Sequence, residues 1–112
     1  MIDGIVEFKD WEKIDLRVGE IIEVDEIEKA DKLYKLKINI GSENKIVCAG
    51  IKQYYSKEEL LNKKIILFVN LKPRILRGIE SQGMILAASN ENSSKIVLIS
   101  PEKDIEAGSR IS

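Results

Sequence analysis

Apolar and polar side chains alternate most clearly between Leu33 and Ile40. Apolar residues stand at every second position and lysine or asparagine lies between them, which is the period of a strand with one face in a core. The stretches Leu16 to Val24 and Lys45 to Gly50 are rich in valine, isoleucine and other apolar residues and predict strands on either side. Residues 41–44 include glycine, serine and asparagine, which favour a hairpin connection. The first half of the chain therefore predicts three consecutive strands.

The second half predicts a short helix and two more strands. Ser56 is followed three residues later by Glu59, a spacing typical of a capping box, so we expect a helix of one or two turns over 57–61. The apolar segments Lys64 to Asn70 and Gly83 to Ser89 predict the fourth and fifth strands. Three strands, a helix and two strands is the element order of a five-stranded OB-fold barrel. The expected fold is thus an all-β barrel with a short helix.

The N-terminal segment predicts an additional short helix. Phe8, Trp11 and Ile14 are three residues apart, which places all three side chains on one side of such a helix. The chain has 112 residues, of which 44% are apolar, enough to form one modest core. We therefore expect a single domain spanning 1–112, with the barrel at about 15–89.

The C-terminal segment is expected to form an extension over about residues 95–112. Lys95 to Ile99 predicts a sixth strand, and Ile105 to Ile111 follow after Pro101 and a polar turn. A five-stranded barrel does not need these residues, so they either cover a barrel end or form a subunit interface. The candidate interface residues are Ile96, Leu98, Ile105 and Ile111.

The charges are distributed unevenly along the chain. The whole sequence has a net charge of −1, which by itself argues against a generally basic nucleic-acid binder. Residues 1–28, however, hold three basic and ten acidic side chains, and residues 29–77 hold twelve basic and four acidic ones. The basic segment coincides with the second and third strands and the loops after the first and fourth, which OB-folds use to bind oligonucleotides. The acidic start is expected to be a solvated surface that would repel RNA and orient the basic face.

Composition excludes several kinds of chemistry. The sequence has no histidine, which removes the usual general base, the Ser/His and Cys/His nucleophile pairs and most zinc sites. Cys48 is the single cysteine, so no internal disulfide forms; nothing nearby would lower its pKa, and we expect a buried core thiol. Met1 leads directly into charged sequence, and the longest apolar runs are five residues, far below the ~20 of a membrane helix. We expect a cytoplasmic protein without catalytic activity, cofactor or metal.

The segment from residue 70 to residue 84 has the side chains best suited to bind RNA. Lys72, Arg74 and Arg77 lie within six residues, with no acidic residue among them. Arginine makes bidentate contacts with phosphate or the edge of guanine, and short polar side chains suit unpaired bases. Met84 offers an adaptable apolar surface for a base, or else belongs to the core. This segment therefore predicts a loop that binds RNA, with Arg74, Arg77, Ser81, Gln82 and Met84 as contacts.

The same segment also has the glycine spacing of a P-loop. Gly78 and Gly83 are separated by four residues, as in that phosphate-binding motif. A P-loop continues with lysine and serine or threonine, whereas Met84 and Ile85 follow here. Binding of a nucleoside triphosphate is therefore excluded.

Four motifs occur in order along the chain: Asp15-Leu16-Arg17-Val18-Gly19, Ala30-Asp31-Lys32-Leu33-Tyr34-Lys35-Leu36, Asn70-Leu71-Lys72-Pro73-Arg74, and Arg77-Gly78-Ile79-Glu80-Ser81-Gln82-Gly83-Met84. Together they resemble the tRNA-binding domain found as the C-terminal appendage or separate beta subunit of methionyl-tRNA synthetase, and in free-standing structure-specific tRNA-binding proteins. The resemblance runs from about Phe8 to the C-terminus.

The resemblance implies a non-catalytic OB-fold that binds tRNA by shape, chiefly at the outer elbow, and a C-terminal extension that packs across a homodimer. Many relatives have His-Pro where this chain has Glu28-Lys29, so the first loop is expected to differ in shape. Cys48 stands where serine is common. Carried over to this sequence, the RNA-binding residues are Asn70, Lys72, Arg74, Arg77, Ser81, Gln82 and Met84, supported by Lys32 and Lys35.

The expected function is that of a dimeric tRNA-binding module. It either raises the affinity of a methionyl-tRNA synthetase catalytic chain for tRNA or acts as a free tRNA-binding protein, and no membrane is involved. Two alternatives stay open. A secretion chaperone similar to this family in fold and dimer form would bind peptides in an apolar groove, although the cluster of Lys72, Arg74 and Arg77 argues against it. A purely structural dimerisation appendage would bind RNA only incidentally.

Overall fold

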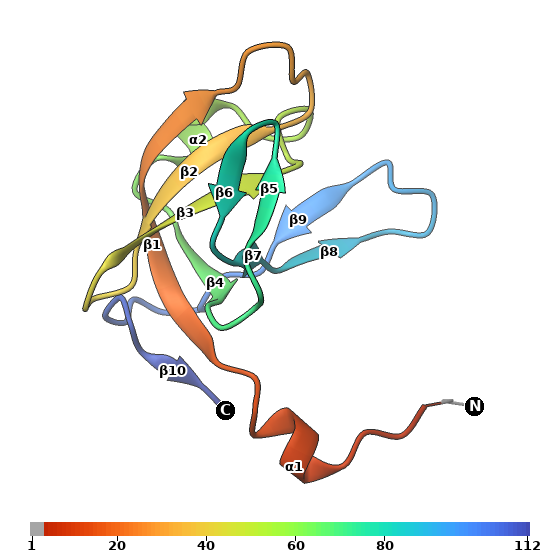
Figure 1. The fold of residues 1–112 in the computed structure, drawn as a ribbon, viewed down its shortest axis with the longest axis vertical. Coiled ribbons are helices and arrows are strands. Elements are labelled where there is room, and N and C mark those ends of the chain that lie inside the picture. The colour runs from red at the N-terminus through yellow and green to blue at the C-terminus, as the bar shows by residue number, and fades with distance from the viewer. Residues whose placement is uncertain (1–3) are drawn as a thin grey trace.

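The computed structural model describes residues 4–112, in which a strongly twisted antiparallel sheet wraps into a barrel (Figure 1). The expected OB-fold barrel is confirmed. Its elements in chain order are α1 (Phe8–Trp11), β1 (Leu16–Glu26), β2 (Tyr34–Asn39), β3 (Asn44–Ala49), α2 (Lys57–Leu60), β4 (Lys64–Phe68), β5 (Arg74–Leu76), β6 (Ile79–Ser81), β7 (Met84–Ile85), β8 (Ala87–Ser89), β9 (Ile96–Leu98) and β10 (Arg110–Ile111).

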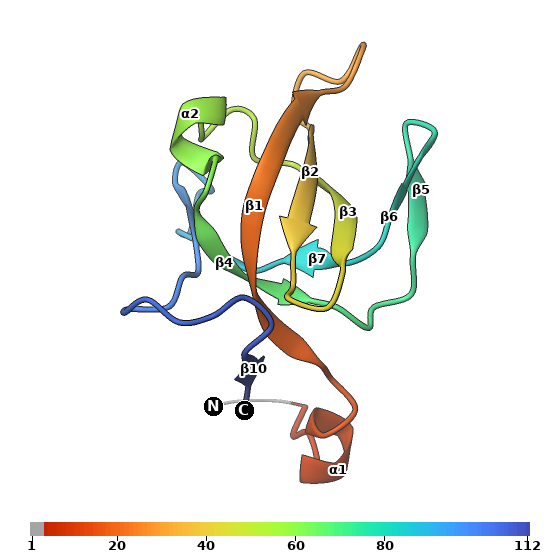
Figure 2. The same ribbon diagram turned by 90° about the vertical axis from the view of Figure 1, so that its left-hand side faces the viewer.

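Strand β1 belongs to both halves of the barrel. The strand order of the main sheet is β3-β2-β1-β4-β7, and β10 pairs with the start of β1. The first residues of β1 pair with β4 and its later residues pair with β2. The register with β2 shifts between Ile21 and Glu23, a bulge that sharpens the bend of the strand. The eleven residues of β1 therefore turn the sheet from one wall of the barrel to the other (Figure 2).

Alternation in β2 builds the centre of the core. Tyr34, Leu36 and Ile38 point inward, and the lysines between them lie on the outer face. Leu60 of α2 is fully buried and closes one end of the barrel. The predicted capping box is present, because the Ser56 hydroxyl accepts from the Glu59 amide at 3.2 Å while the Glu59 carboxylate accepts from the Ser56 amide at 2.8 Å.

The segment predicted as one fifth strand over 83–89 is two strands. Leu67 of β4 pairs with Ile85 of β7, whereas Ala87 of β8 pairs with Leu98 of β9 in a separate hairpin. The chain leaves the barrel at Leu86, whose amide donates to Ile66 O at 3.1 Å and whose carbonyl accepts from the Ile99 amide at 3.0 Å. The prediction of one continuous strand is wrong because the first part of the segment pairs with β4 and the second part pairs with β9.

The C-terminal residues cover one end of the barrel. The Gly108 amide donates to Val18 O at 2.7 Å, and the Ser109 carbonyl accepts from the Val18 amide at 2.9 Å. Gly108 has a φ of 94°, and a side-chain carbon there would overlap the carbonyl oxygen of Ile40. Only glycine allows the C-terminal turn to pack this closely on the β2–β3 connection. Residues 108–111 of the extension are therefore attached to the barrel through β1.

The four candidate interface residues have different environments. Leu98 is 5% exposed and packs inside the barrel core, so its expected place in a subunit interface is corrected to a core position. Ile96 packs partly buried against the same core, and Ile111 packs against a second cluster formed by β1 and β4. Ile105 is 42% exposed and lies on the surface. The alternation of β9 places Leu98 inward, which the isolated apolar run did not reveal.

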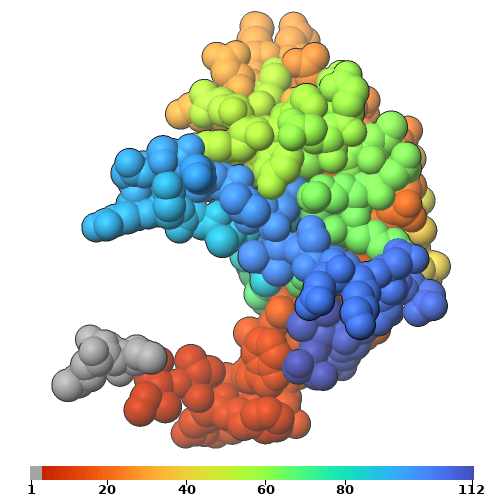
Figure 3. All heavy atoms as spheres, turned by 180° about the vertical axis from the view of Figure 1, so that it is seen from behind, coloured from red at the N-terminus to blue at the C-terminus, as the bar shows by residue number. Residues whose placement is uncertain are grey.

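Two arms project from the barrel and enclose a hollow. Figure 3 shows this hollow between the β8–β9 hairpin and the N-terminal segment that contains α1. Phe8 is 71% exposed on one arm and Val97 is 53% exposed on the other. Within residues 4–112, no helix is long and apolar enough to cross a membrane.

Candidate nucleic-acid interface

Acidic residues neutralise part of the basic segment. Glu23 on β1 pairs with Lys37 at 2.7 Å, and Glu26 at the end of β1 pairs with Lys52 at 2.6 Å and Lys57 at 3.7 Å. The Lys52 ammonium, through its hydrogen bond, holds the pKa of the Glu26 carboxyl below its usual range. The acidic start of the chain is therefore more than a solvated surface, because it neutralises lysines from β2 to α2.

Six of the cations without an ion-pair partner among residues 4–112 gather at one end of the barrel. The loop after β1 and the β5–β6 hairpin project at this end (Figure 2). Lys29, Lys32 and Arg77 line one pocket there, and Lys72 and Arg74 line a second pocket at the base of the hairpin. We call this surface the basic rim. It consists of Lys29, Lys32, Lys35, Lys72, Arg74 and Arg77, which have no ion-pair partner among residues 4–112.

The β5–β6 hairpin presents Arg77 at its tip. Leu76 pairs with Ile79, which leaves Arg77 and Gly78 as a two-residue turn. Both turn residues have positive φ, 51° and 80°, as a type I′ turn requires. Asparagine or glycine normally occupies the first position, because other residues are strained in the left-handed region. The sequence places an arginine there, and strained residues of this kind cluster at functional sites.

Ser81 and Gln82 attach the hairpin to β3. The Ser81 hydroxyl accepts from the Cys48 amide at 3.0 Å, and the Gln82 side-chain oxygen accepts from the Ile46 amide at 2.8 Å. The Gln82 amide donates to Ile46 O at 2.8 Å. Ser81 is 4% exposed, and its hydroxyl also donates to Gly83 O at 3.3 Å. The Ser81 hydroxyl and the Gln82 side-chain oxygen are therefore engaged within the protein and close the gap in the sheet beside β3.

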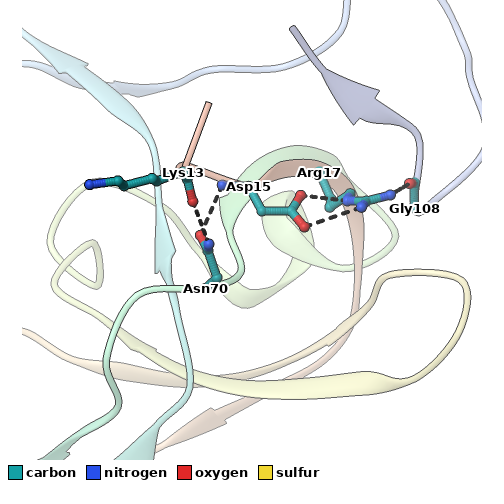
Figure 4. A network of polar contacts seen from close by, with 5 residues as sticks. All are labelled: Lys13, Asp15, Arg17, Asn70 and Gly108. Atoms are coloured by element: carbon teal, nitrogen blue, oxygen red, sulfur yellow. Dashed lines mark hydrogen bonds and ion pairs between the residues drawn. The ribbon is translucent and has the colours of Figure 1, made fainter. Parts of the chain in front are cut away.

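Asn70 is likewise engaged in an internal network (Figure 4). Its side-chain oxygen accepts from the Asp15 amide at 2.8 Å, and its side-chain nitrogen donates to Lys13 O at 2.6 Å. Arg17 donates to the Asp15 carboxylate at 2.6 and 3.1 Å and to Gly108 O at 3.2 Å. The Arg17 guanidinium holds the pKa of the Asp15 carboxyl below its usual range. This network links the N-terminal segment, the end of β4 and the C-terminal turn.

Cys48 and Met84 both lie on the outer face of the barrel. The expectation of a buried core thiol is corrected, because Val47 and Ala49 point inward and Cys48 points outward, half-buried. Burial raises the pKa of the Cys48 thiol, an effect that the nearby Lys35 ammonium opposes. Met84 is 47% exposed, which removes the alternative that it belongs to the core.

Sequence reasoning missed two features of this site. The predicted RNA-binding residues do not include Lys29, although it lines one pocket with Arg77 and so belongs to the rim. The segment over 70–83 was expected to be a loop. Its β5–β6 hairpin has a signal that could have been used, since Arg77 and Gly78 form a two-residue glycine turn between apolar positions. No group of three potential metal-ligating side chains occurs in the part of the chain that the structure describes.

We predict that Ser81→Ala and Gln82→Ala loosen the hairpin. Each substitution leaves a β3 amide without its partner, which should lower the free energy of unfolding by about 1–3 kcal/mol. Hydrogen exchange at the Cys48 and Ile46 amides should become faster. Glu80→Ala is the matched control, because Glu80 directly precedes Ser81 and is exposed. Unchanged exchange in both variants would contradict the attachment described here.

Comparison with known proteins places this architecture in a family. A family model described as "Putative tRNA binding domain" matches residues 16–110. A methionine–tRNA ligase from Caldanaerobacter subterraneus subsp. tengcongensis is 51% identical over 96% of this chain, although the chain spans only 16% of that ligase. A solved MetRS-related protein from Pyrococcus horikoshii is 33% identical, has a TM-score of 0.91, and is matched over 97% of this chain and 99% of its own.

A second solved structure shows the same architecture. The CsaA chaperone protein from Picrophilus torridus is 37% identical with a TM-score of 0.86, over 96% of this chain and 100% of its own. The residues matched by the family model include all ten strands except the last residue of β10. The chain therefore belongs to the tRNA-binding domain family that also forms part of methionine–tRNA ligases.

Proposed function

We propose that this chain binds tRNA through the basic rim. The observation that supports this most strongly is the gathering of six cations without ion-pair partners in residues 4–112 around two neighbouring loops. Phosphate contacts supply most of the sequence-independent affinity of proteins for nucleic acids. Glu23 and Glu26 of β1 are already paired with lysines outside the rim. The surface potential is therefore concentrated at one end of a molecule whose net charge is −1.

The proposed recognition depends on shape more than on sequence. Asn70, Ser81 and Gln82 use their polar groups within the protein, so they act as positioning residues for the rim. Lys32, Lys35, Lys72, Arg74 and Arg77 remain as contacts to phosphate and sugar, together with Lys29. Contacts of this kind fix the position of an RNA without reading its bases.

The proposed role is that of a non-catalytic, cytoplasmic module. The methionine–tRNA ligases that match this chain contain the domain as a small part of their length, which supports a function in raising the tRNA affinity of such a ligase, in the same chain or in a separate one. Free tRNA binding is the other form of the same proposal. A second copy of the chain is the proposed partner at the hollow, where Phe8 and Val97 expose apolar surface.

A peptide-binding chaperone is the second candidate function. The similarity to the CsaA chaperone structures supports it, as does the exposed apolar surface of Leu71 and Met84. Lys72 and Arg74 adjoin those side chains and favour an anionic ligand instead. A charge-reversal experiment separates the two functions.

We predict that Arg74→Glu combined with Arg77→Glu reduces tRNA affinity by tenfold or more, because charge-assisted contacts contribute about 1.5–3 kcal/mol each. For the unmodified protein, log K against log salt should have a slope of about −2 to −4, as expected for three to five phosphate contacts. Lys95→Glu combined with Lys103→Glu carries the same charge change away from the rim and should reduce affinity much less. Equal losses of affinity in both double variants, or an affinity independent of salt, would contradict tRNA binding by the rim. If the domain is a purely structural appendage, charge reversal at Arg74 and Arg77 should cause no change in a tRNA shift assay.

A further prediction concerns the strained turn. Arg77→Asn should raise the free energy of unfolding by up to about 1 kcal/mol, because asparagine tolerates the left-handed conformation better. The same substitution should weaken tRNA binding through loss of the guanidinium. Ser93→Asn is a matched control, since Ser93 also has a positive φ of 56° but lies in the β8–β9 connection. Thermal unfolding and anisotropy with labelled tRNA measure the two effects. An affinity equal to that of the original protein would show that Arg77 is not a contact.

A further inference from the structure

We propose that the pocket at the base of the β5–β6 hairpin holds one unstacked base of the bound RNA, with the adjoining phosphate on its cations. The inference rests on the proposed function and deepens it, because it states which feature of the RNA this part of the surface selects. We call this cavity the Met84 pocket. Its lining residues are Cys48, Leu71, Lys72, Arg74, Ser81 and Met84, with Gly83 contributing backbone.

The Met84 pocket has the size and the apolar walls that a base requires. Cys48 comes from β3, Met84 from β7 and Leu71 from the segment before the hairpin. Met84 is 47% and Leu71 36% exposed, so both present apolar surface to a ligand. The cavity volume is about 310 Å³. A cavity of about 150 Å³ is sufficient for benzene, so a purine or pyrimidine ring fits here.

Cations border the apolar walls on one side. Arg74 pairs with Ser81 across the hairpin, so both side chains lie on the hairpin face that is directed toward β3. Lys72 precedes the hairpin and lines the same pocket. Neither cation has an ion-pair partner in residues 4–112. An apolar surface for a flat ring beside positive charges for an anion is complementary to a nucleotide. Methionine is polarizable and adapts to rings of different shape.

The Ser81 hydroxyl in this pocket and the Gln82 side-chain oxygen beside it are already used within the protein. The Ser81 hydroxyl accepts from the Cys48 amide and donates to Gly83 O, and the Gln82 side-chain oxygen accepts from the Ile46 amide. These groups do not read the hydrogen-bonding edge of a base. The pocket therefore selects a base that is free to leave its stack, and it discriminates weakly between the four bases. Fully paired RNA offers no such base.

Cys48 provides a built-in reporter of occupancy. It is the single cysteine of the sequence and it lines the pocket. We would measure the rate at which the Cys48 thiol reacts with a disulfide reagent in the presence of saturating RNA. One RNA is a stem closed by an unpaired four-nucleotide loop, and the other is a blunt duplex with the same number of phosphates. The loop RNA is expected to slow the reaction by about fivefold or more, and the duplex is not.

A substitution in the pocket wall tests the same inference through affinity. Burial of the half-exposed Met84 side chain against a base should contribute about fivefold to binding. Met84→Ala should therefore remove most of the preference for loop RNA over duplex RNA. Loops of uridine and of adenosine should bind within a few-fold of each other. Leu61→Ala is the control, because Leu61 is 48% exposed at the end of α2, outside the rim, and should leave the preference unchanged.

Each outcome supports or overturns the inference. Protection of Cys48 by loop RNA, together with the lost preference of Met84→Ala, supports it. Tight binding of tRNA and of both RNAs, without protection and without any effect of Met84→Ala, overturns the base pocket and leaves tRNA binding intact. Failure of every RNA to bind overturns both proposals. Protection by an apolar peptide and not by RNA assigns the pocket to a peptide.

Discussion

The attachment of the β5–β6 hairpin to β3 is the constraint on which the binding surface depends. Strand β3 lies at the end of the strand order and would otherwise leave its Ile46 and Cys48 amides without partners. Buried or half-buried amides are costly to leave unsatisfied, so the side chains of Ser81, which ends β6, and of Gln82, which follows it, both stabilise the barrel and fix the hairpin. Arg74 and Arg77 gain a defined position because Ser81 and Gln82, at the end of the same hairpin, are hydrogen-bonded to β3.

The charge distribution follows from the pairing of β1. Its outer residues Glu23 and Glu26 face lysines of β2 and of the segment around α2, and the resulting ion pairs remove those lysines from the available positive surface. Exposed pairs of this kind contribute little to stability. Their effect is on the electrostatic potential, because they leave the basic rim as the concentrated positive region. A slightly acidic protein can thus present a cationic surface at one end.

Periodicity was sufficient to predict most of the barrel. The alternation from Leu33 to Ile40 and the Ser56–Glu59 spacing depend on contacts a few residues apart, and both predictions are confirmed. The split between β7 and β8 was not predictable in this way, because it depends on which distant strand each residue meets.

The surface position of the cations in the site was predictable from the sequence, whereas the roles of its neutral polar residues were not. Lysine and arginine without a nearby acid remain at the surface wherever the chain folds, so the location of Lys72, Arg74 and Arg77 could be inferred from residue type. The roles of Asn70, Ser81 and Gln82 depend on partners 33 to 57 residues away. A short polar side chain has the same appearance in a sequence whether it binds RNA or a backbone amide. The outward direction of the Cys48 side chain likewise depends on the register between β2 and β3. In this register Cys48 lies opposite Lys35, whose side chain is on the outer face.

The most direct test of the central claim is a map of backbone amide NMR signals on addition of tRNA. The account predicts that the largest changes fall in residues 29–35, in the β5–β6 hairpin and around Cys48 and Met84. Signals from the β8–β9 hairpin and the C-terminal turn should change little. Changes concentrated at the hollow between α1 and the β8–β9 hairpin, with the basic rim unaffected, would contradict it.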